Sequence, residues 1–208
     1  MLEKESTDLK LMNYLAHLFL AEDTPESRIG NLLGDFVKGS LERYKTHYSE
    51  SILKGIETHR RVDFFTDTHY FYKESKQRLS KIHRHFSGVI IDIFYDHFLA
   101  KNWSQFSKES LEEFADKIYK ILEKNRNILP ERLQRNLPVM ISENWLVLYK
   151  KIEGIDLACQ RLSRRIKRAN SLALAQDELL KNYDEIELDF LSFFPEIINY
   201  VETNRPYF

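Results

Sequence analysis

The sequence has few of the residues that interrupt helices or cross-link chains. Six glycines and five prolines occur among 208 residues, which favours long helices over turn-rich β structure. The single cysteine, Cys159, cannot form an internal disulfide, which is typical of a reducing compartment. No apolar run is long enough to cross a membrane, and the charged start of the chain has no secretory signal. We therefore expect a cytoplasmic protein that does not act at a membrane.

Charge is nearly balanced, because 31 basic side chains oppose 32 acidic ones and leave a net charge of -1. This balance argues against a dedicated nucleic-acid binder, which is usually basic overall. Hydrophobic residues make up 43% of the chain, enough for a substantial core in one large domain. Since no linker or repeat divides the chain, the sequence predicts an all-α fold, a single-domain helical bundle.

Helix-start signals place several helices. Thr24-Pro25-Glu26 combines a cap, a proline at the first helical position and an acid near the positive end of the helix dipole. Ser49 is expected to open the next helix, and residues 87–103 are apolar nearly all round, which is typical of a central, buried helix. Further helices are expected over 111–122, 130–149 and 155–168, and from 179 onward.

The helix after Ser49 carries an unusual stripe. Ile52, Ile56, His59, Asp63 and Asp67 recur at three- or four-residue steps, so they share one face of the helix. An apolar stripe therefore becomes an imidazole and two carboxylates. His59 and Asp63, one turn apart, can point at one ion or at each other, and a simple ion pair of Asp63 with a neighbouring arginine is the alternative.

The central helix contains a similar pattern. Asp92 and Asp96 are four residues apart, and His97 follows directly among apolar neighbours. A buried carboxylate is unfavourable unless it is paired, hydrogen-bonded or bound to a metal. Two carboxylates on one face also repel each other without a cation between them.

Asp35 and His17 are also polar residues in apolar segments. Asp35 follows Gly34, and Gly30 lies one turn earlier, which would let another helix approach closely. His17 lies in Leu15 to Phe19, where a core hydrogen bond is the alternative to ligation. Histidines and aspartates from several helices favour an oxygen and nitrogen metal site, which suits manganese, magnesium, iron or zinc.

Several segments in order carry a resemblance to a known family. They are NYLAHL at 13–18, GNLLGDFVKG at 30–39, GIETHRRVD at 55–63, DHFL at 96–99, WLV at 145–147 and SRR at 163–165. Together they resemble the acyl carrier protein phosphodiesterases, a family distantly similar to the all-helical HD-type metal phosphohydrolases. The resemblance starts at Met12, so residues 1–11 are expected to be a tail and residues 12–208 an HD-domain-like phosphodiesterase domain.

This resemblance implies an activity, a cofactor and a partner. It implies removal of 4'-phosphopantetheine from the serine of holo acyl carrier protein, a small acidic protein, with a divalent metal. Manganese is the first expectation, with magnesium or Fe²⁺ as alternatives. A bound cation would activate water and neutralise a phosphoryl oxygen.

Candidate residues for these roles fall into four groups. The expected metal ligands are Asp35, His59, Asp92, Asp96 and His97. The expected catalytic residues are Asp35, His59, Arg60, Asp63 and His17, the last as a candidate acid. Phosphate is expected to contact Lys38, Arg60 and Arg61, because arginine suits two phosphate oxygens. Carrier docking is expected on a basic helix face formed by Arg161, Arg164, Arg165 and Arg168.

Two other functions fit the same residues. The first is an HD-type phosphohydrolase that acts on a nucleotide or another small phosphoester. The second is a helical adaptor without enzymatic activity, in which the buried polar groups are structural and the basic helix binds a partner.

Overall fold

The computed structural model describes residues 14–166 and 170–206, and all regular structure within these ranges is helical. The α-helices are α2 (Leu15–Leu20), α3 (Pro25–Leu33), α4 (Glu50–Thr68), α5 (Tyr70–Arg78), α6 (Ser87–Lys101), α7 (Trp103–Phe106), α8 (Leu111–Lys124), α9 (Glu131–Ser142), α10 (Trp145–Leu148), α11 (Ile152–Arg165), α12 (Ala175–Lys181) and α13 (Tyr183–Thr203). Four short 3-10 segments connect them: η1 (Leu41–Tyr44), η2 (Lys81–Phe86), η3 (Arg126–Ile128) and η4 (Leu172–Leu174). The predicted all-α class is confirmed, whereas the expected tail over residues 1–11 lies outside the described residues.

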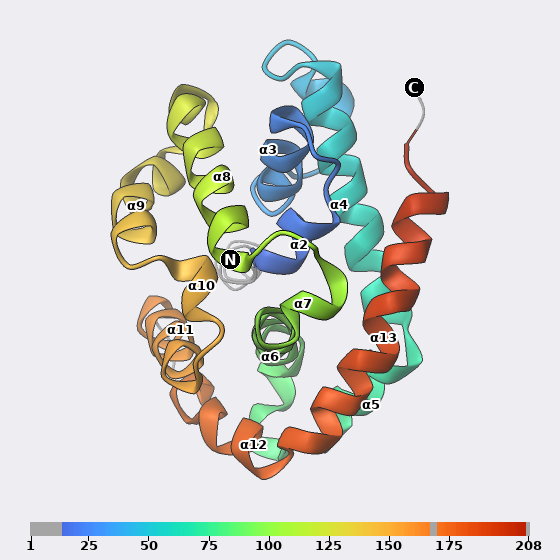
Figure 1. Cartoon of the computed structure of the whole chain (residues 1–208), viewed down its shortest axis with the longest axis vertical. Helices are drawn as coiled ribbons and strands as arrows, with labels where there is room; N and C mark the ends of the chain where they lie inside the picture. The colour runs from blue at the N-terminus through green and yellow to red at the C-terminus, as the bar shows by residue number, and fades with distance from the viewer. Residues whose placement is uncertain (1–13, 167–169, 207–208) are drawn as a thin grey trace.

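Helix α6 occupies the middle of the molecule (Figure 1), as its apolar composition predicts. It contacts α2, α5, α11 and α13. Ile90, Ile93 and Phe94 are fully buried, and one continuous core includes apolar side chains from nearly every helix. Because the middle of α6 is buried, its buried polar groups Asp96 and His97 must find partners inside the protein.

The predicted starts of α3 and α4 are confirmed. The Thr24 hydroxyl accepts a hydrogen bond from the Ser27 backbone N–H, and Pro25 is the first residue of α3. The Ser49 hydroxyl accepts from the Ile52 backbone N–H at the start of α4. Each cap satisfies one of the backbone donors that the first turn of a helix leaves unpaired.

Helices α3 and α4 approach each other through glycines. A Cβ atom at Gly30 would lie 2.3 Å from the Ile52 carbonyl oxygen and 2.7 Å from the Gly55 Cα. A Cβ atom at Gly55 would in turn lie 2.8 Å from the Ser27 carbonyl oxygen. Because these neighbours are backbone atoms that cannot turn aside, both positions exclude every other residue at this spacing.

Two predicted helices are each divided in the structure. The segment from Pro130 to Tyr149 forms α9 and α10, with Asn144 between them at a left-handed φ of 49°. The last segment forms α12 and α13, which are separated at Asn182. An asparagine tolerates the left-handed region better than most residues do, and this explains the first break.

The cysteine and the lengths of the helices complete the description of the fold. Cys159 is fully buried as a small core residue, as predicted. Within residues 14–166 and 170–206, no helix combines the length and apolar character that a membrane span requires.

The contact between α3 and α4 predicts the effect of one substitution. Gly30→Ala would place a methyl group against the α4 backbone, so the free energy of unfolding should fall by about 1–3 kcal/mol. Chemical denaturation followed by circular dichroism measures this change.

Gly88→Ala is the matched control, because its Cβ atom would meet only the Tyr72 hydroxyl at 3.5 Å. In the first turn of α6 this alanine should be neutral or stabilise the protein by up to about 1 kcal/mol. Equal stability of the two variants would contradict the close contact between α3 and α4.

Candidate functional site

Four ionisable side chains from three segments meet in the interior. His17 comes from α2, Asp35 lies two residues beyond the end of α3, and His59 and Asp63 lie one turn apart on α4. His59 Nε2 lies 3.5 Å from an oxygen of Asp35 and 3.5 Å from an oxygen of Asp63. His17 Nε2 lies 3.3 Å from the other Asp63 oxygen. We refer to His17, Asp35, His59 and Asp63 as the His–Asp cluster.

The His59 ring is held in place from α3. Its Nδ1 donates a hydrogen bond to the Asn31 carbonyl oxygen at 2.8 Å, since a carbonyl oxygen only accepts. A Cβ atom at Gly34 would lie 2.1 Å from His59 Cγ, so the ring occupies the space that this glycine leaves. These contacts direct Nε2 toward Asp35 and Asp63.

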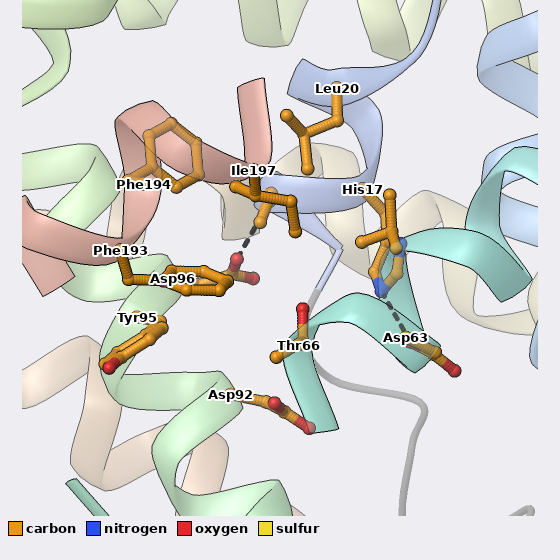
Figure 2. A pocket seen from close by; sticks show the side chains of 12 residues that line it. His17, Leu20, Asp63, Thr66, Asp92, Tyr95, Asp96, Phe193, Phe194 and Ile197 are labelled. Atoms are coloured by element: carbon orange, nitrogen blue, oxygen red, sulfur yellow. Dashed lines mark hydrogen bonds and ion pairs between the residues drawn. The ribbon is translucent and has the colours of Figure 1, made fainter. Parts of the chain in front are cut away.

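His17 is held differently. Its ring stacks on the His59 ring, with centroids 3.9 Å apart and planes 20° from parallel. Figure 2 shows the ring pointing toward Asp63. Its Nδ1 is buried and has no hydrogen-bond partner among the described residues. The orientation of this imidazole therefore depends on the stack, on Asp63 and on the position of α2.

The arrangement provides donor atoms at the spacing of a metal site. One nitrogen from each of His17 and His59 and one oxygen of Asp63 all lie within 4.8 Å of one another. An oxygen of Asp35 lies 3.5 Å from His59 Nε2, so Asp35 could add a second carboxylate. Imidazole and carboxylate donors without thiolate suit a hard or borderline divalent cation.

Electrostatic coupling inside the cluster is strong. Burial alone would lower the pKa of His59, but the charges of Asp63 and Asp35 outweigh it and raise the pKa to about 10. Burial would raise the pKa of Asp63, yet the facing His59 and the hydrogen bond from His17 hold it well below its usual range. Burial and the neighbouring His59 lower the pKa of His17. These shifts favour the charged form of His59 and of Asp63 and the neutral form of His17.

A small cavity adjoins the cluster. Its volume is about 40 Å³, and His17, Asp63, Thr66, Asp92 and Asp96 contribute its polar lining. Asp63 is the most exposed member of the cluster, with 27% of its side chain accessible, against 7% or less for the other three. Access from solvent is therefore on the Asp63 side.

Asp92, an expected metal ligand, lies apart from the His–Asp cluster. It lines the same cavity in Figure 2, and its carboxylate accepts a hydrogen bond from the Tyr72 hydroxyl at 2.8 Å. It is absent from the group of donor atoms within 4.8 Å of one another that the described residues form.

Two further expected ligands, Asp96 and His97, bond to protein groups outside the His–Asp cluster. The two carboxylate oxygens of Asp96 accept the backbone N–H groups of Leu15 and Ala16, at 2.9 and 2.8 Å. His97 Nδ1 donates to the Tyr149 carbonyl oxygen at 2.7 Å, and Nε2 accepts from the Tyr183 hydroxyl at 2.8 Å. Both side chains are occupied by protein partners away from His59, so their burial has a structural explanation.

The expected phosphate ligands have different surroundings. Lys38 is exposed. Arg60 donates to the Val37 carbonyl oxygen at 3.0 Å, and Arg61 contacts Glu57 and the Asn204 carbonyl oxygen. The alternative pairing of Asp63 with Arg60 or Arg61 gains no support from these contacts.

The expected docking arginines have different surroundings. Arg161 pairs with Glu143 and lies over the Trp145 ring, 4.9 Å from its centroid. Arg164 is exposed, with a hydrogen bond to Gln160. Arg165 is half-buried, and Arg168 lies outside the described residues. Arg164 is therefore the member of this set that lies most openly on the surface of α11.

The buried Tyr14, which precedes α2, is influenced by charges from three other segments. Burial and the charge of Asp35 raise the pKa of Tyr14, while the charges of Arg165 and Arg132 act in the opposite direction. Arg165 of α11 and Arg132 of α9 thus lie within electrostatic reach of the residue that precedes α2.

Comparison with known proteins identifies relatives over nearly the whole chain. The model of a family described as acyl carrier protein phosphodiesterase matches residues 12–197. The acyl carrier protein phosphodiesterase of Pectobacterium atrosepticum is 32% identical over 195 residues, 93% of this chain and all of the relative. Those of Escherichia coli O6:H1 and Yersinia pestis are each 34% identical over 90% of this chain and 96% of their own length. No solved structure matches the chain.

The raised pKa of His59 predicts a pH dependence of stability in the presence of a chelator. The folded-state pKa of about 10 exceeds the ordinary 6.5, so the stability that protonated His59 contributes is fully present below about pH 6.5. It should be lost as the pH rises from 6.5 to 10. Urea unfolding at several pH values measures this decline.

His59→Gln should flatten the decline, because glutamine does not titrate. The control is His47→Gln, which replaces an exposed histidine beside Thr46 and should keep the wild-type slope. A wild-type stability that does not change between pH 6.5 and 10 would contradict the proposed charge state of His59.

Proposed function

The chain belongs to the acyl carrier protein phosphodiesterase family, and from this premise we propose that it removes 4'-phosphopantetheine from holo acyl carrier protein with the help of a divalent cation. Membership makes the chain a phosphodiesterase. The observation that carries the finer proposal is the His–Asp cluster, in which three donor atoms lie within 4.8 Å of one another. The expected cytoplasmic location belongs to the same proposal.

The donor set fits a divalent cation. His59 donates its Nδ1 hydrogen to the Asn31 carbonyl, so in the neutral tautomer Nε2 carries the lone pair that a metal requires. His17, His59 and Asp63 would hold the ion, with Asp35 as a further carboxylate. Manganese is our first proposal, with magnesium or Fe²⁺ as alternatives.

When bound, such an ion supplies a Lewis acid that polarises a phosphoryl oxygen and makes water a stronger nucleophile. Asp63, the cluster residue most open to solvent, marks the side from which the phosphodiester would approach. The carboxylates of Asp63 and Asp35 exclude a second anion from the cluster unless positive charge is added. A cation would therefore be required for a phosphate to bind here.

Arginines from α9 and α11 would help to hold the phosphate. The charges of Arg132 and Arg165 lower the pKa of Tyr14, the residue before α2, while Asp35 raises it. A guanidinium can contact two phosphate oxygens at once. Arg60, which the Val37 carbonyl holds beside the end of α3, remains a second proposed phosphate ligand.

The decisive assay uses holo acyl carrier protein and Mn²⁺, with mass spectrometry of the carrier before and after incubation. We expect the mass to fall to that of the apo carrier, with release of phosphopantetheine and no reaction when a chelator is present. Nucleotide hydrolysis without conversion of the carrier would contradict the proposed substrate and favour a small-phosphoester hydrolase.

Substitutions test the proposed ligands. His59→Ala and Asp63→Asn should each reduce kcat/KM by more than about 100-fold, because loss of even an outer partner of a metal ligand reduces affinity or activity 10- to 100-fold. Isothermal titration with Mn²⁺ should show a matching loss of affinity.

The control variant is Asp116→Asn, which removes an exposed carboxylate that pairs with Lys120. It should leave both activity and Mn²⁺ affinity unchanged. Full activity of Asp63→Asn in the same preparation would remove Asp63 from the proposed site.

Docking of the acidic carrier would use the exposed end of α11. Arg164→Glu should raise KM for the carrier severalfold at low salt and leave kcat unchanged, because a repulsive charge weakens encounter. Lys120→Glu is the matched reversal on α8, where the lysine is 74% exposed. Equal KM changes in the two variants would mean that net charge, rather than this face, controls carrier binding.

A further inference from the structure

Helix α2 is too short to be stable on its own, yet it carries one of the two imidazoles of the His–Asp cluster. It has six residues, Leu15–Leu20, fewer than two turns. An isolated helix of this length does not form in water, because the first turn fixes many dihedral angles for little gain. Contacts from the rest of the fold must therefore hold α2 in place.

The N-terminal end of α2 is held by a carboxylate from another helix. Tyr14, its N-cap residue, supplies no side-chain hydrogen bond. Asp96 of α6 instead accepts the N–H groups of Leu15 and Ala16, one with each oxygen. Burial raises the pKa of Asp96 to about 8, whereas these two hydrogen bonds act in the opposite direction and favour the ionised carboxylate.

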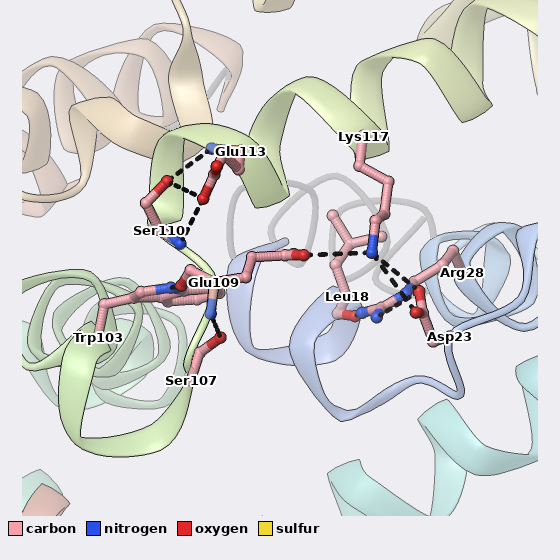
Figure 3. A network of polar contacts seen from close by, with 9 residues as sticks. All are labelled: Leu18, Asp23, Arg28, Trp103, Ser107, Glu109, Ser110, Glu113 and Lys117. Atoms are coloured by element: carbon pink, nitrogen blue, oxygen red, sulfur yellow. Dashed lines mark hydrogen bonds and ion pairs between the residues drawn. The ribbon is translucent and has the colours of Figure 1, made fainter.

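The C-terminal end of α2 is held by a buried arginine. Arg28 of α3 is 6% exposed, donates to the Leu18 carbonyl oxygen and stacks over the Phe114 ring at 4.9 Å. Figure 3 shows Arg28 lying between Leu18 and Asp23, with Lys117 also contacting Asp23. An acidic group thus faces the N-terminus and a basic group the C-terminus, which matches the helix dipole.

The two imidazoles differ in what orients them. His59 has a ring hydrogen bond to Asn31, whereas Nδ1 of His17 has no partner among the described residues. Besides the contact of its Nε2 with Asp63 and the stack on His59, the orientation of this ring depends on the position of the α2 backbone. We propose that Asp96 and Arg28 are positioning residues that hold α2 at both ends and thereby place His17 against His59 and Asp63.

This inference rests on the proposed function of the cluster, and substitutions with matched controls test it. Asp96→Asn keeps one acceptor but turns an N–H₂ group toward the second backbone donor. Asp189→Asn is the control, since Asp189 is another buried aspartate, joins α13 to α5 through Arg78 and Ser75, and does not touch α2. Thermal unfolding measures the stability of both variants, and kcat and KM are expressed per folded molecule.

We expect Asp96→Asn to lower kcat at least about tenfold, since small misplacements of a reacting group can cost up to about 100-fold, with KM for the carrier little changed. Asp189→Asn should lose comparable stability and keep kcat. Equal kcat in the two variants, at wild-type level, would overturn the proposal. If wild-type protein does not convert holo carrier, the proposed function fails instead.

A measurement that does not depend on activity distinguishes failure of the positioning role from failure of the proposed function. In the wild type, NMR should detect a nuclear Overhauser contact between the stacked rings of His17 and His59, and Asp96→Asn should weaken it. An unchanged contact would overturn the positioning role whatever the enzyme does. If Asp96→Asn does not fold, Arg28→Lys is tested instead, with Arg78→Lys as its control. Arg28→Lys should then show the loss of kcat and of ring contact that is expected of Asp96→Asn.

Discussion

The close approach of α3 and α4 is the constraint on which the site depends. A Cβ atom at Gly30 or Gly55 would collide with the backbone of the facing helix, and one at Gly34 would occupy the place of the His59 ring. These glycines bring the Asn31 carbonyl within hydrogen-bond reach of His59. The same approach sets Asp35 beside His59 Nε2. A helix pair at ordinary spacing would separate the imidazole from the carboxylate.

Two carboxyl groups lie together in the interior, where an ionised carboxylate requires compensating positive charge. The described residues provide it through His59, whose pKa the neighbouring carboxylates raise to about 10 despite burial. A divalent cation would replace that single proton with two charges, which is the physical basis of the proposed metal dependence. Buried charges elsewhere in the fold have protein partners, as Asp189 has in Arg78.

Local chemistry made much of the fold predictable. The caps at Thr24 and Ser49 and the apolar α6 are encoded in short segments, and the structure confirms them. The pairing of His59 and Asp63 follows from their spacing of one helical turn. Helical periodicity could not reveal the breaks at Asn144 and Asn182, because single residues determine them.

The partners of polar groups at the site are harder to predict. Spacing along α6 placed Asp96 and His97 correctly in the interior, but it could not tell which helices face them. Asp96 meets the backbone of α2, and His97 meets Tyr149 and Tyr183. Burial of a polar group thus predicts that a partner exists, while the identity of the partner depends on tertiary packing.

The most direct test of the cluster as a cation site is anomalous diffraction from crystals soaked in Mn²⁺. The account predicts an anomalous peak among His17 Nε2, His59 Nε2 and the Asp63 carboxylate, the three donor positions that lie within 4.8 Å of one another. Active enzyme whose manganese lies elsewhere, with His59 still bonded to Asp35 and Asp63, would contradict it.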